Sequence, residues 1–207
     1  MLDTVLMVDL DGVVLEKATP WTEDLQKDLG LCPADLQQSF FRPHWTEIVC
    51  GRLPIRGVLA DVLDQLGSSL PVSALLDYWF DKSGAANHRV LQGILSLREQ
   101  GFAVHCATNQ EPERINYLWH KHRMDNYFNR VHYSAELGYR KPDRQFFEAV
   151  AGRFNGDDPI FCLIDDTPEN VRGAIESGWV GIHWTGSSDI VDLAWPLAAL
   201  RRESNND

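Results

Sequence analysis

The sequence has few cysteines and no long apolar run, and both absences limit what the protein can be. Its cysteines, Cys32, Cys50, Cys106 and Cys162, form no CxxC pair, so we expect reduced thiols and not a metal cluster or a disulfide set. No apolar stretch approaches the roughly 20 residues that span a bilayer, and no signal peptide precedes the first apolar segment. The expectation is a cytoplasmic protein with no membrane partner.

Basic residues are also scarce. Lys and Arg total 19 against 30 Asp and Glu, which gives a formal net charge of −11. Surfaces that bind nucleic acid or anionic membranes need basic patches, so this composition argues against both kinds of partner. With 207 residues, 44% of them hydrophobic, the chain is long enough for one well-buried domain and a subdomain.

Two carboxylates one residue apart follow the first apolar run. Residues 4–8 read as a buried strand, and Asp9, Asp11 and Gly12 come directly after them. Residues two apart on a strand point to the same side, so both carboxyl groups could meet one reacting centre. We interpret Asp9 as a nucleophile. The alternative is an ordinary polar exit from a strand, where Asp and Gly are common.

The rest of the chain has two parts with different patterns of predicted secondary structure. Residues 16–83 contain helix-like segments that are punctuated by prolines, and they predict a small helical insert between 1–15 and 84–207. From Ala86 onward helix-like and strand-like segments alternate, which predicts an α/β fold with a parallel sheet covered by helices on both faces.

Polar and charged residues that could bind a ligand or take part in catalysis follow the predicted strands. Thr108 and Asn109 end one apolar run, Asp165 and Asp166 end another, and Lys141 starts a helix between them. In a parallel sheet the carboxyl ends of the strands lie at one edge, so these side chains converge with the first acidic pair.

The charges at this edge predict a metal ion. If Asp11 is protonated, Asp9, Asp165 and Asp166 contribute −3, which a partly buried cleft does not tolerate without partners. Lys141 supplies +1 and a divalent ion +2. Hard oxygen ligands favour Mg²⁺.

These motifs resemble those of the haloacid dehalogenase superfamily of phosphohydrolases. The residues that carry the resemblance are Asp9-Leu10-Asp11-Gly12, Thr108-Asn109, Lys141-Pro142, and Asp165-Asp166 with Asn170. The stretches 137–143 and 164–171 resemble the subgroup that includes sugar-phosphate phosphatases. The resemblance implies a Rossmann-like sheet of order 5-4-1-2-3 and makes the insert at 16–83 a helical cap over the sheet edge of the core, 1–15 and 84–207.

The resemblance also implies a role for each acidic residue. Asp9 attacks phosphorus and forms an aspartyl-phosphate, while Asp11 protonates the leaving alcohol and later accepts a proton from water. The Asp9 carboxylate and the Asp11 carbonyl bind Mg²⁺, with Asp166 as the third protein ligand and Asp165 close by, directly or through water.

The remaining motif residues are implied to bind the phosphoryl group. The Thr108 hydroxyl and the backbone N–H of Asn109 hold its oxygens, and Lys141 pairs with Asp9 and the phosphate. A short cap implies a small phosphorylated metabolite, with a sugar phosphate as the expected class. The cap side chains considered for specificity are Arg42, His44, Trp45, Arg52 and Arg56.

Other functions share parts of this pattern. A dehalogenase attacks carbon and has no use for Asp11, whereas a sugar-phosphate mutase uses the same core. A phosphonate hydrolase would need a Schiff-base lysine among Lys17, Lys27 and Lys82. A phospho-receiver module carries its acidic pair before the acceptor Asp, opposite to the order here, and a domain that only binds phosphorylated ligands would not need every motif residue.

Overall fold

The computed structural model describes residues 4–16, 19–82, 84–154 and 159–193. Its centre is a parallel sheet of five strands in the order β3-β2-β1-β4-β5, which confirms the predicted order 5-4-1-2-3 read from the other edge. The strands are β1 (Thr4–Val8), β2 (Ala103–Thr108), β3 (Val131–Tyr133), β4 (Ile160–Asp165) and β5 (Val180–His183). Every residue of the central strand β1 is buried, because helices cover both faces of the sheet.

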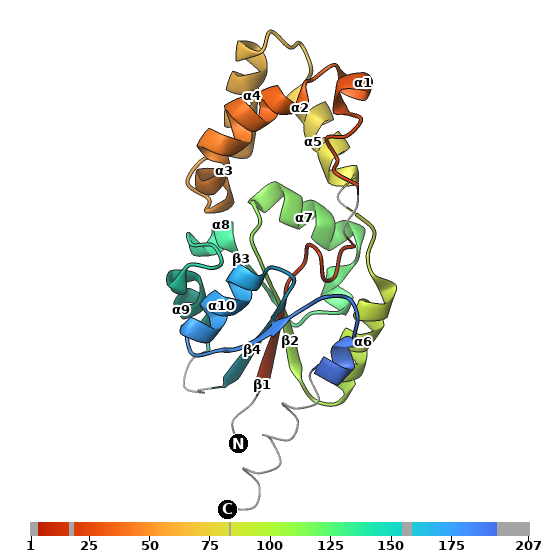
Figure 1. The fold of residues 1–207 in the computed structure, drawn as a ribbon, viewed down its shortest axis with the longest axis vertical. Coiled ribbons are helices and arrows are strands. Elements are labelled where there is room, and N and C mark those ends of the chain that lie inside the picture. The colour runs from red at the N-terminus through yellow and green to blue at the C-terminus, as the bar shows by residue number, and fades with distance from the viewer. Residues whose placement is uncertain (1–3, 17–18, 83, 155–158, 194–207) are drawn as a thin grey trace, which may run out of the picture.

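The helices around the sheet form two layers (Figure 1). They are α6 (His88–Glu99), α7 (Pro112–Lys121), α8 (Ser134–Leu137), α9 (Arg144–Ala151) and α10 (Pro168–Glu176), with a short 3-10 turn η2 (Met124–Asn126). Apolar side chains of α6 and α7 pack on one face, and those of α9 and α10 pack on the other. The helix expected at 190–200 begins at Ile190, and residues 194–200 lie outside the described part.

A group of helices between β1 and α6 stands over one end of the sheet (Figure 1). It consists of α1 (Leu25–Leu29), α2 (Pro33–Leu36), the π-helical turn η1 (Gln37–Phe41), α3 (Arg42–Val49), α4 (Ile55–Gln65) and α5 (Val72–Asp81). These helices pack around a hydrophobic cluster of their own, which includes Phe40, Leu59 and Trp79. The helical cap that the sequence predicts after the first strand is therefore present, and we call it the insert.

Pro43 is one of the prolines that punctuate the helix-like segments of residues 16–83, but the chain is helical without interruption from Pro33 to Val49. Proline lacks a backbone N–H, and its ring clashes with the carbonyl one turn earlier in a regular α-helix. Here the π-helical turn Gln37–Phe41 comes directly before it, and the Arg42 N–H donates to the Gln37 carbonyl oxygen. This wider turn precedes the proline at the point where a regular helix would be strained.

The two connections of the insert lie side by side. Leu15 and Ala86 form an antiparallel bridge, and the Asn87 N–H donates to the Val14 carbonyl oxygen over 2.8 Å. Asn87 also caps α6 by accepting from the Val90 N–H. The chain therefore leaves and re-enters the sheet-bearing part at one place, while the domain boundaries at 16 and 83 stay a prediction.

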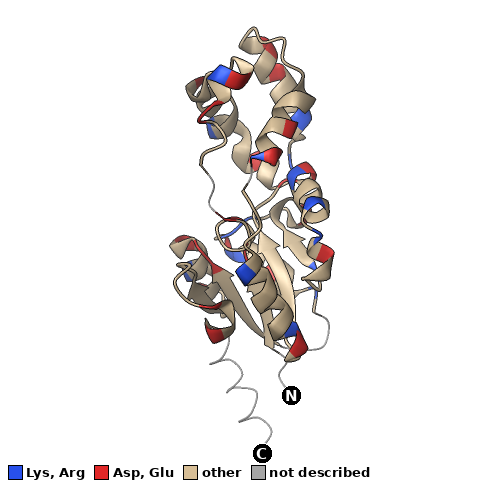
Figure 2. Ribbon diagram, turned by 90° about the vertical axis from the view of Figure 1, so that its right-hand side faces the viewer, with Lys and Arg blue, Asp and Glu red and all other residues tan. Residues whose placement is uncertain are grey.

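The insert also contacts the sheet-bearing part through α7 and α8. Arg56 of α4 pairs with Glu113 of α7 over 2.6 Å, and Asp81 of α5 pairs with Lys121 over 3.0 Å. In Figure 2, acidic and basic residues lie side by side at this junction. Within the described ranges, no helix has the length and apolarity that a membrane crossing requires.

Candidate active site

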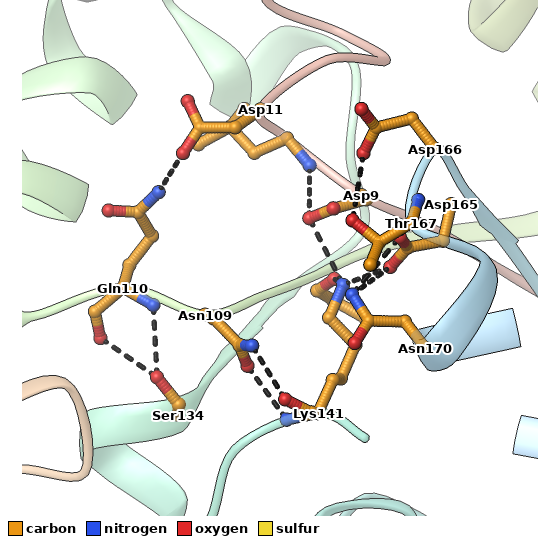
Figure 3. A network of polar contacts seen from close by, with 12 residues as sticks. Asp9, Asp11, Asn109, Gln110, Ser134, Lys141, Asp165, Asp166, Thr167 and Asn170 are labelled. Carbon is orange, nitrogen blue, oxygen red and sulfur yellow. Dashed lines mark hydrogen bonds and ion pairs between the residues drawn. The ribbon is translucent and has the colours of Figure 1, made fainter. Parts of the chain in front are cut away.

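The predicted site residues converge below the insert. A cavity of about 410 Å³ is lined there by Asp9, Thr108, Asn109, Lys141 and Asp166, among others. They come from the ends of three strands and from the loop between α8 and α9. Figure 3 shows Asp9, Asn109, Lys141 and Asp166 gathered in one polar network. The parallel sheet thus brings together residues that lie far apart in the sequence.

The turn after β1 depends on glycine. Asp9 extends the strand pairing by one bond, because its N–H donates to the Ile164 carbonyl oxygen over 2.9 Å. Gly12 follows with φ of +80°, and a Cβ there would lie 2.2 Å from Oδ2 of Asp166. Gly12 therefore serves both a left-handed backbone and the close approach of the second acidic motif.

Lys141 is the buried cation of the site. Its Nζ donates over 2.6 Å to the Ala107 carbonyl oxygen and to Asp165 Oδ2, and it lies 3.1 Å from Asp9 Oδ1. These three partners match the three N–H donors of an ammonium group. Asn109 holds the Lys141 backbone: its Nδ2 donates to the Lys141 carbonyl over 2.9 Å, and its Oδ1 accepts from the Lys141 N–H over 2.8 Å.

Burial acts on Asp9 and Lys141 in opposite ways. It raises the pKa of Asp9 to about 7, although the Lys141 charge lowers it, and the charges of Asp165 and Asp11 add to the rise. For Lys141 burial disfavours the ammonium form, but the charges of Asp9 and Asp165 outweigh this cost and raise its pKa. Lys141 is therefore a fixed positive charge, and Asp9 needs further positive charge beside it to be fully ionised.

The two members of the acidic pair differ in surroundings. Asp165 is fully buried, and its carboxylate accepts from Lys141, from the Thr167 N–H over 2.8 Å and from the Asn170 amide over 3.1 Å. Asp166 lines the cavity. Asn170 lies one helical turn after Asp166, and that spacing predicts a supporting hydrogen bond there; its amide bonds the neighbouring Asp165 instead.

The carboxylates form a donor set that could hold a divalent cation. One oxygen from each of Asp9, Asp165 and Asp166 lies within 4.8 Å of the others. Three carboxylates face a single ammonium group, Lys141, so the local charge calls for a further cation of about +2. All the donors are hard oxygens, the type that Mg²⁺ prefers. The residues present therefore fit the predicted ion.

The Asp11 side chain turns away from this group. Arg114 Nη1 and Nη2 donate to its two oxygens over 2.8 Å each, and Gln110 Nε2 donates over 2.6 Å. Burial raises the pKa of Asp11, but the Arg114 charge and these hydrogen bonds outweigh it, so the pKa is lowered. The premise of a protonated Asp11 is wrong for this structure: Arg114, not a proton, balances its charge.

Arg114 and Gln110 hold Asp11, and the sequence motifs do not predict either of them. Arg114 lies on α7 one turn before Leu118, which is buried, and it is itself 8% exposed. A cation on the buried side of a helix needs an anionic partner, so the helical spacing of Arg114 and Leu118 is the feature of the sequence that could have indicated its ion pair. Its position just after the Thr108-Asn109 motif makes the sheet edge the place to look for that partner.

The insert forms the other side of the cavity, with different residues from those predicted. The lining residues that belong to it and its connections are Glu16, Thr19, Pro20, Trp21, Trp79 and Lys82. None of the five side chains considered for specificity lines the cavity. Arg52 bonds Glu47 and the Gly138 carbonyl oxygen, and Arg56 bonds Glu113. Both arginines bind these nearer partners, so they contribute to the surface and to the contact between the insert and the sheet-bearing part.

Comparison with known proteins gives consistent matches. A sequence model of the haloacid dehalogenase-like hydrolases matches residues 4–178. A sesquiterpene phosphatase of Aspergillus oryzae is 32% identical over 131 residues, which cover 61% of this chain and 67% of that protein. The flavin mononucleotide hydrolase 1 of Arabidopsis thaliana is 36% identical over 103 residues, 49% of this chain and 41% of that protein.

A solved structure resembles the fold. An enzyme of the same family from Bacteroides thetaiotaomicron, crystallised with magnesium and inorganic phosphate, has a TM-score of 0.76 at 20% sequence identity. The match covers 93% of this chain and 99% of that chain. At this level of identity the likeness concerns the fold, including the insert over the sheet edge.

Proposed function

This chain belongs to the haloacid dehalogenase-like hydrolases, and we propose from that premise that it is a Mg²⁺-dependent phosphatase of small phosphomonoesters. The observation that carries the proposal is the pairing of two differently placed carboxylates. Asp9 faces the cavity beside Lys141 over 3.1 Å, and Asp11 is held two residues away by Arg114. The printed names of two relatives, a sesquiterpene phosphatase and a flavin mononucleotide hydrolase, support phosphate ester hydrolysis.

The proposed reaction has two displacements at phosphorus. An Asp9 oxygen attacks, the bond between phosphorus and the alcohol oxygen breaks, and an aspartyl-phosphate forms. Water then attacks the aspartyl-phosphate, which releases inorganic phosphate and restores Asp9. Thr108 and the backbone N–H of Asn109 are proposed to hold the phosphoryl oxygens, while Lys141 supplies fixed positive charge.

Asp11 is proposed to move the protons in both steps. As a base it takes a proton from the attacking water, and in the protonated form that results it gives this proton to the leaving alcohol of the next turnover. Its ion pair with Arg114, with N–O distances of 2.8 Å, favours the ionised form that the second step requires. We therefore propose that Arg114 positions Asp11 for the attack of water.

Asp9 and Asp166 line the cavity, so we propose that these two carboxylates hold Mg²⁺ together with the Asp11 carbonyl oxygen. When bound, the ion neutralises negative charge on the phosphoryl oxygens. Asp165 lies at the same site but has its oxygens engaged by Lys141 and Asn170. Its proposed role is to fix Lys141 and to remain close to the ion.

Hydrolysis of p-nitrophenyl phosphate tests the proposal. We expect turnover with Mg²⁺, loss of turnover with EDTA, and no turnover in Asp9→Asn protein. Asp125→Asn is a matched control, because Asp125 is exposed and pairs only with Arg123, over 3.7 Å, among the contacts described. Activity that survives both EDTA and Asp9→Asn would refute the mechanism.

A second measurement separates hydrolysis from the mutase alternative. A phosphatase releases one inorganic phosphate for each ester consumed, whereas a mutase returns an isomer of a sugar phosphate without net release. We expect stoichiometric phosphate release. A sugar phosphate stays the substrate class that the sequence suggests, and a panel of phosphorylated metabolites tests it.

A further inference from the structure

The insert presents an aromatic wall to the reacting carboxylates. Trp21 and Trp79 both line the cavity that contains Asp9. Their rings are nearly parallel, with centroids 5.0 Å apart and an angle of 15° between the planes. Phe41 packs against both of them, with centroids 6.2 and 5.5 Å away. Trp21 is therefore held in a fixed orientation while part of it reaches the cavity.

The polar residues on this side of the cavity are Glu16, Thr19 and Lys82, and the lysine is engaged by residues of the insert. Lys82 lies 3.5 Å from Asp28 and 3.8 Å from Asp24, and its Nζ stands 4.5 Å from the ring centroid of Tyr78. The contacts with Tyr78 and then with Asp28 raise the pKa of Lys82, which argues against a Schiff-base lysine. A sugar needs several convergent hydrogen-bond partners in its pocket. The Trp21 side of the cavity offers ring surface instead.

A larger hollow of about 1240 Å³ adjoins this cavity. The two spaces share Glu16, Thr19, Pro20 and Lys82 as lining residues. The larger hollow continues between the end of α5, the start of α6 and the end of α7. An alcohol bound beside Trp21 thus has room to extend past the phosphate site.

The cations around the larger hollow have acidic partners. Lys121 pairs with Asp81 over 3.0 Å, and Arg89 pairs with an aspartate over 3.4 Å. Arg123 pairs with its neighbour Asp125 over 3.7 Å. Because these cations already have partners and the acidic residues Glu16 and Glu23 also line the hollow, it suits an uncharged group better than a second phosphate.

We propose that the substrate is a phosphomonoester of an alcohol that carries an aromatic ring, and that this ring lies against Trp21 with its uncharged remainder in the adjoining hollow. This inference rests on the proposed phosphatase activity and replaces the sugar by an aromatic alcohol. A ring platform that is already ordered by Trp79 and Phe41 loses little conformational entropy on binding. Offset or edge-on ring contacts add attraction beyond the burial of area.

The test compares three phosphomonoesters, 2-phenylethyl phosphate, n-octyl phosphate and glucose 6-phosphate, with Mg²⁺ present. We expect the highest kcat/KM for the phenylethyl ester. Trp21→Ala should lower its kcat/KM by about 3- to 10-fold, mainly through KM, and should reduce its advantage over glucose 6-phosphate. Trp21→Phe keeps a ring and should retain most of that advantage.

Controls separate binding from folding. Leu53→Ala removes an apolar side chain of the insert that is 37% exposed and does not line the cavity, so it should leave the three kcat/KM values unchanged. If Trp21→Ala lowers the unfolding midpoint in urea, Trp21→Leu replaces it as the ring-free variant.

Two outcomes overturn the aromatic assignment. One is a higher kcat/KM for glucose 6-phosphate than for the phenylethyl ester. The other is an equal kcat/KM for the phenylethyl and octyl esters, together with an equal effect of Trp21→Ala on both. Either leaves the phosphatase proposal standing. Absence of Mg²⁺-dependent turnover on all three esters and on p-nitrophenyl phosphate would refute the phosphatase proposal itself.

Discussion

Replacing Lys141 by methionine tests how the buried charges at the sheet edge are balanced. Lys141 and Asp165 have side chains with 0% exposure, and 2.6 Å separates Nζ from Oδ2. Methionine is similar in length and carries no charge, so the substitution keeps most of the packing. It leaves the Asp165 carboxylate buried without its cation, and it removes the neighbour of Asp9.

The size of the effect follows from the geometry. Two unit charges at this distance attract by about 6 kcal/mol at an effective dielectric constant of about 20. Removing one partner of a buried pair costs about 3–5 kcal/mol, because the other charge remains uncompensated. We expect the free energy of unfolding of Lys141→Met to fall by about that amount. Adding Asp165→Asn removes the orphaned charge and should recover at least ~1 kcal/mol.

Urea unfolding at pH 7 measures these changes, with EDTA present so that a bound divalent ion does not substitute for the lost cation. Lys27→Met is the matched control, since Lys27 is exposed on α1, and it should change the free energy of unfolding by less than ~0.5 kcal/mol. The reasoning would be refuted if Lys141→Met lowered the free energy of unfolding by no more than the Lys27→Met control does. A double variant that is no more stable than the single one would also refute it.

Two further predictions concern the glycine turn and a buried histidine pair. Gly12→Ala places a Cβ 2.2 Å from Asp166 Oδ2 and should weaken Mg²⁺ activation at least ~10-fold, measured by titrating activity with Mg²⁺; Gly67→Ala, whose Cβ meets nothing within 4 Å, controls for backbone strain alone. Burial lowers the pKa of His105 to about 4 and that of His132 to about 3 in the folded protein, whereas the ordinary pKa of histidine is about 6.5. Below pH 6.5 the unfolded chain therefore binds more protons than the folded protein does. The free energy of unfolding should therefore fall as pH drops from 6.5 toward 4, and His132→Leu should reduce that slope by up to ~1.4 kcal/mol per pH unit in urea unfolding; an unchanged slope would contradict a neutral buried pair.

The sheet could be predicted from the sequence because its strands are buried on both faces. Such strands read as continuous apolar runs, and β4, Ile160–Asp165, is the clearest case. The insert was harder. Its helices are short, and the run from Pro33 to Val49 continues through Pro43, which a π-helical turn precedes. A proline in the sequence predicts a helix break, and it does not indicate that a π-helical turn will come before it.

In the candidate site, too, the residues at strand ends could be predicted from the sequence and those on helices and loops could not. Asp9, Thr108 and Asp165 could be placed together because parallel strands put their carboxyl ends at one edge. Arg114 and Trp21 could not, because they reach the site from helical or looped segments whose position depends on tertiary packing. The length of a strand fixes where its last residue lies, whereas a long side chain on a helix can point to several partners. The charge premise about Asp11 was wrong for this reason.

Helix α7 connects the insert with Asp11. Glu113 pairs with Arg56 of the insert, and the next residue, Arg114, pairs with Asp11. The first pair is exposed, with side-chain exposures of 33% and 55%, so it contributes only about 0–1 kcal/mol. The second joins an Arg114 side chain that is 10% exposed to Asp11 through two parallel hydrogen bonds, the stronger arrangement for a guanidinium and a carboxylate. The Arg56–Glu113 pair can therefore break at small cost while Arg114 keeps Asp11 in place, so two ion pairs that begin at neighbouring residues of one helix differ in strength.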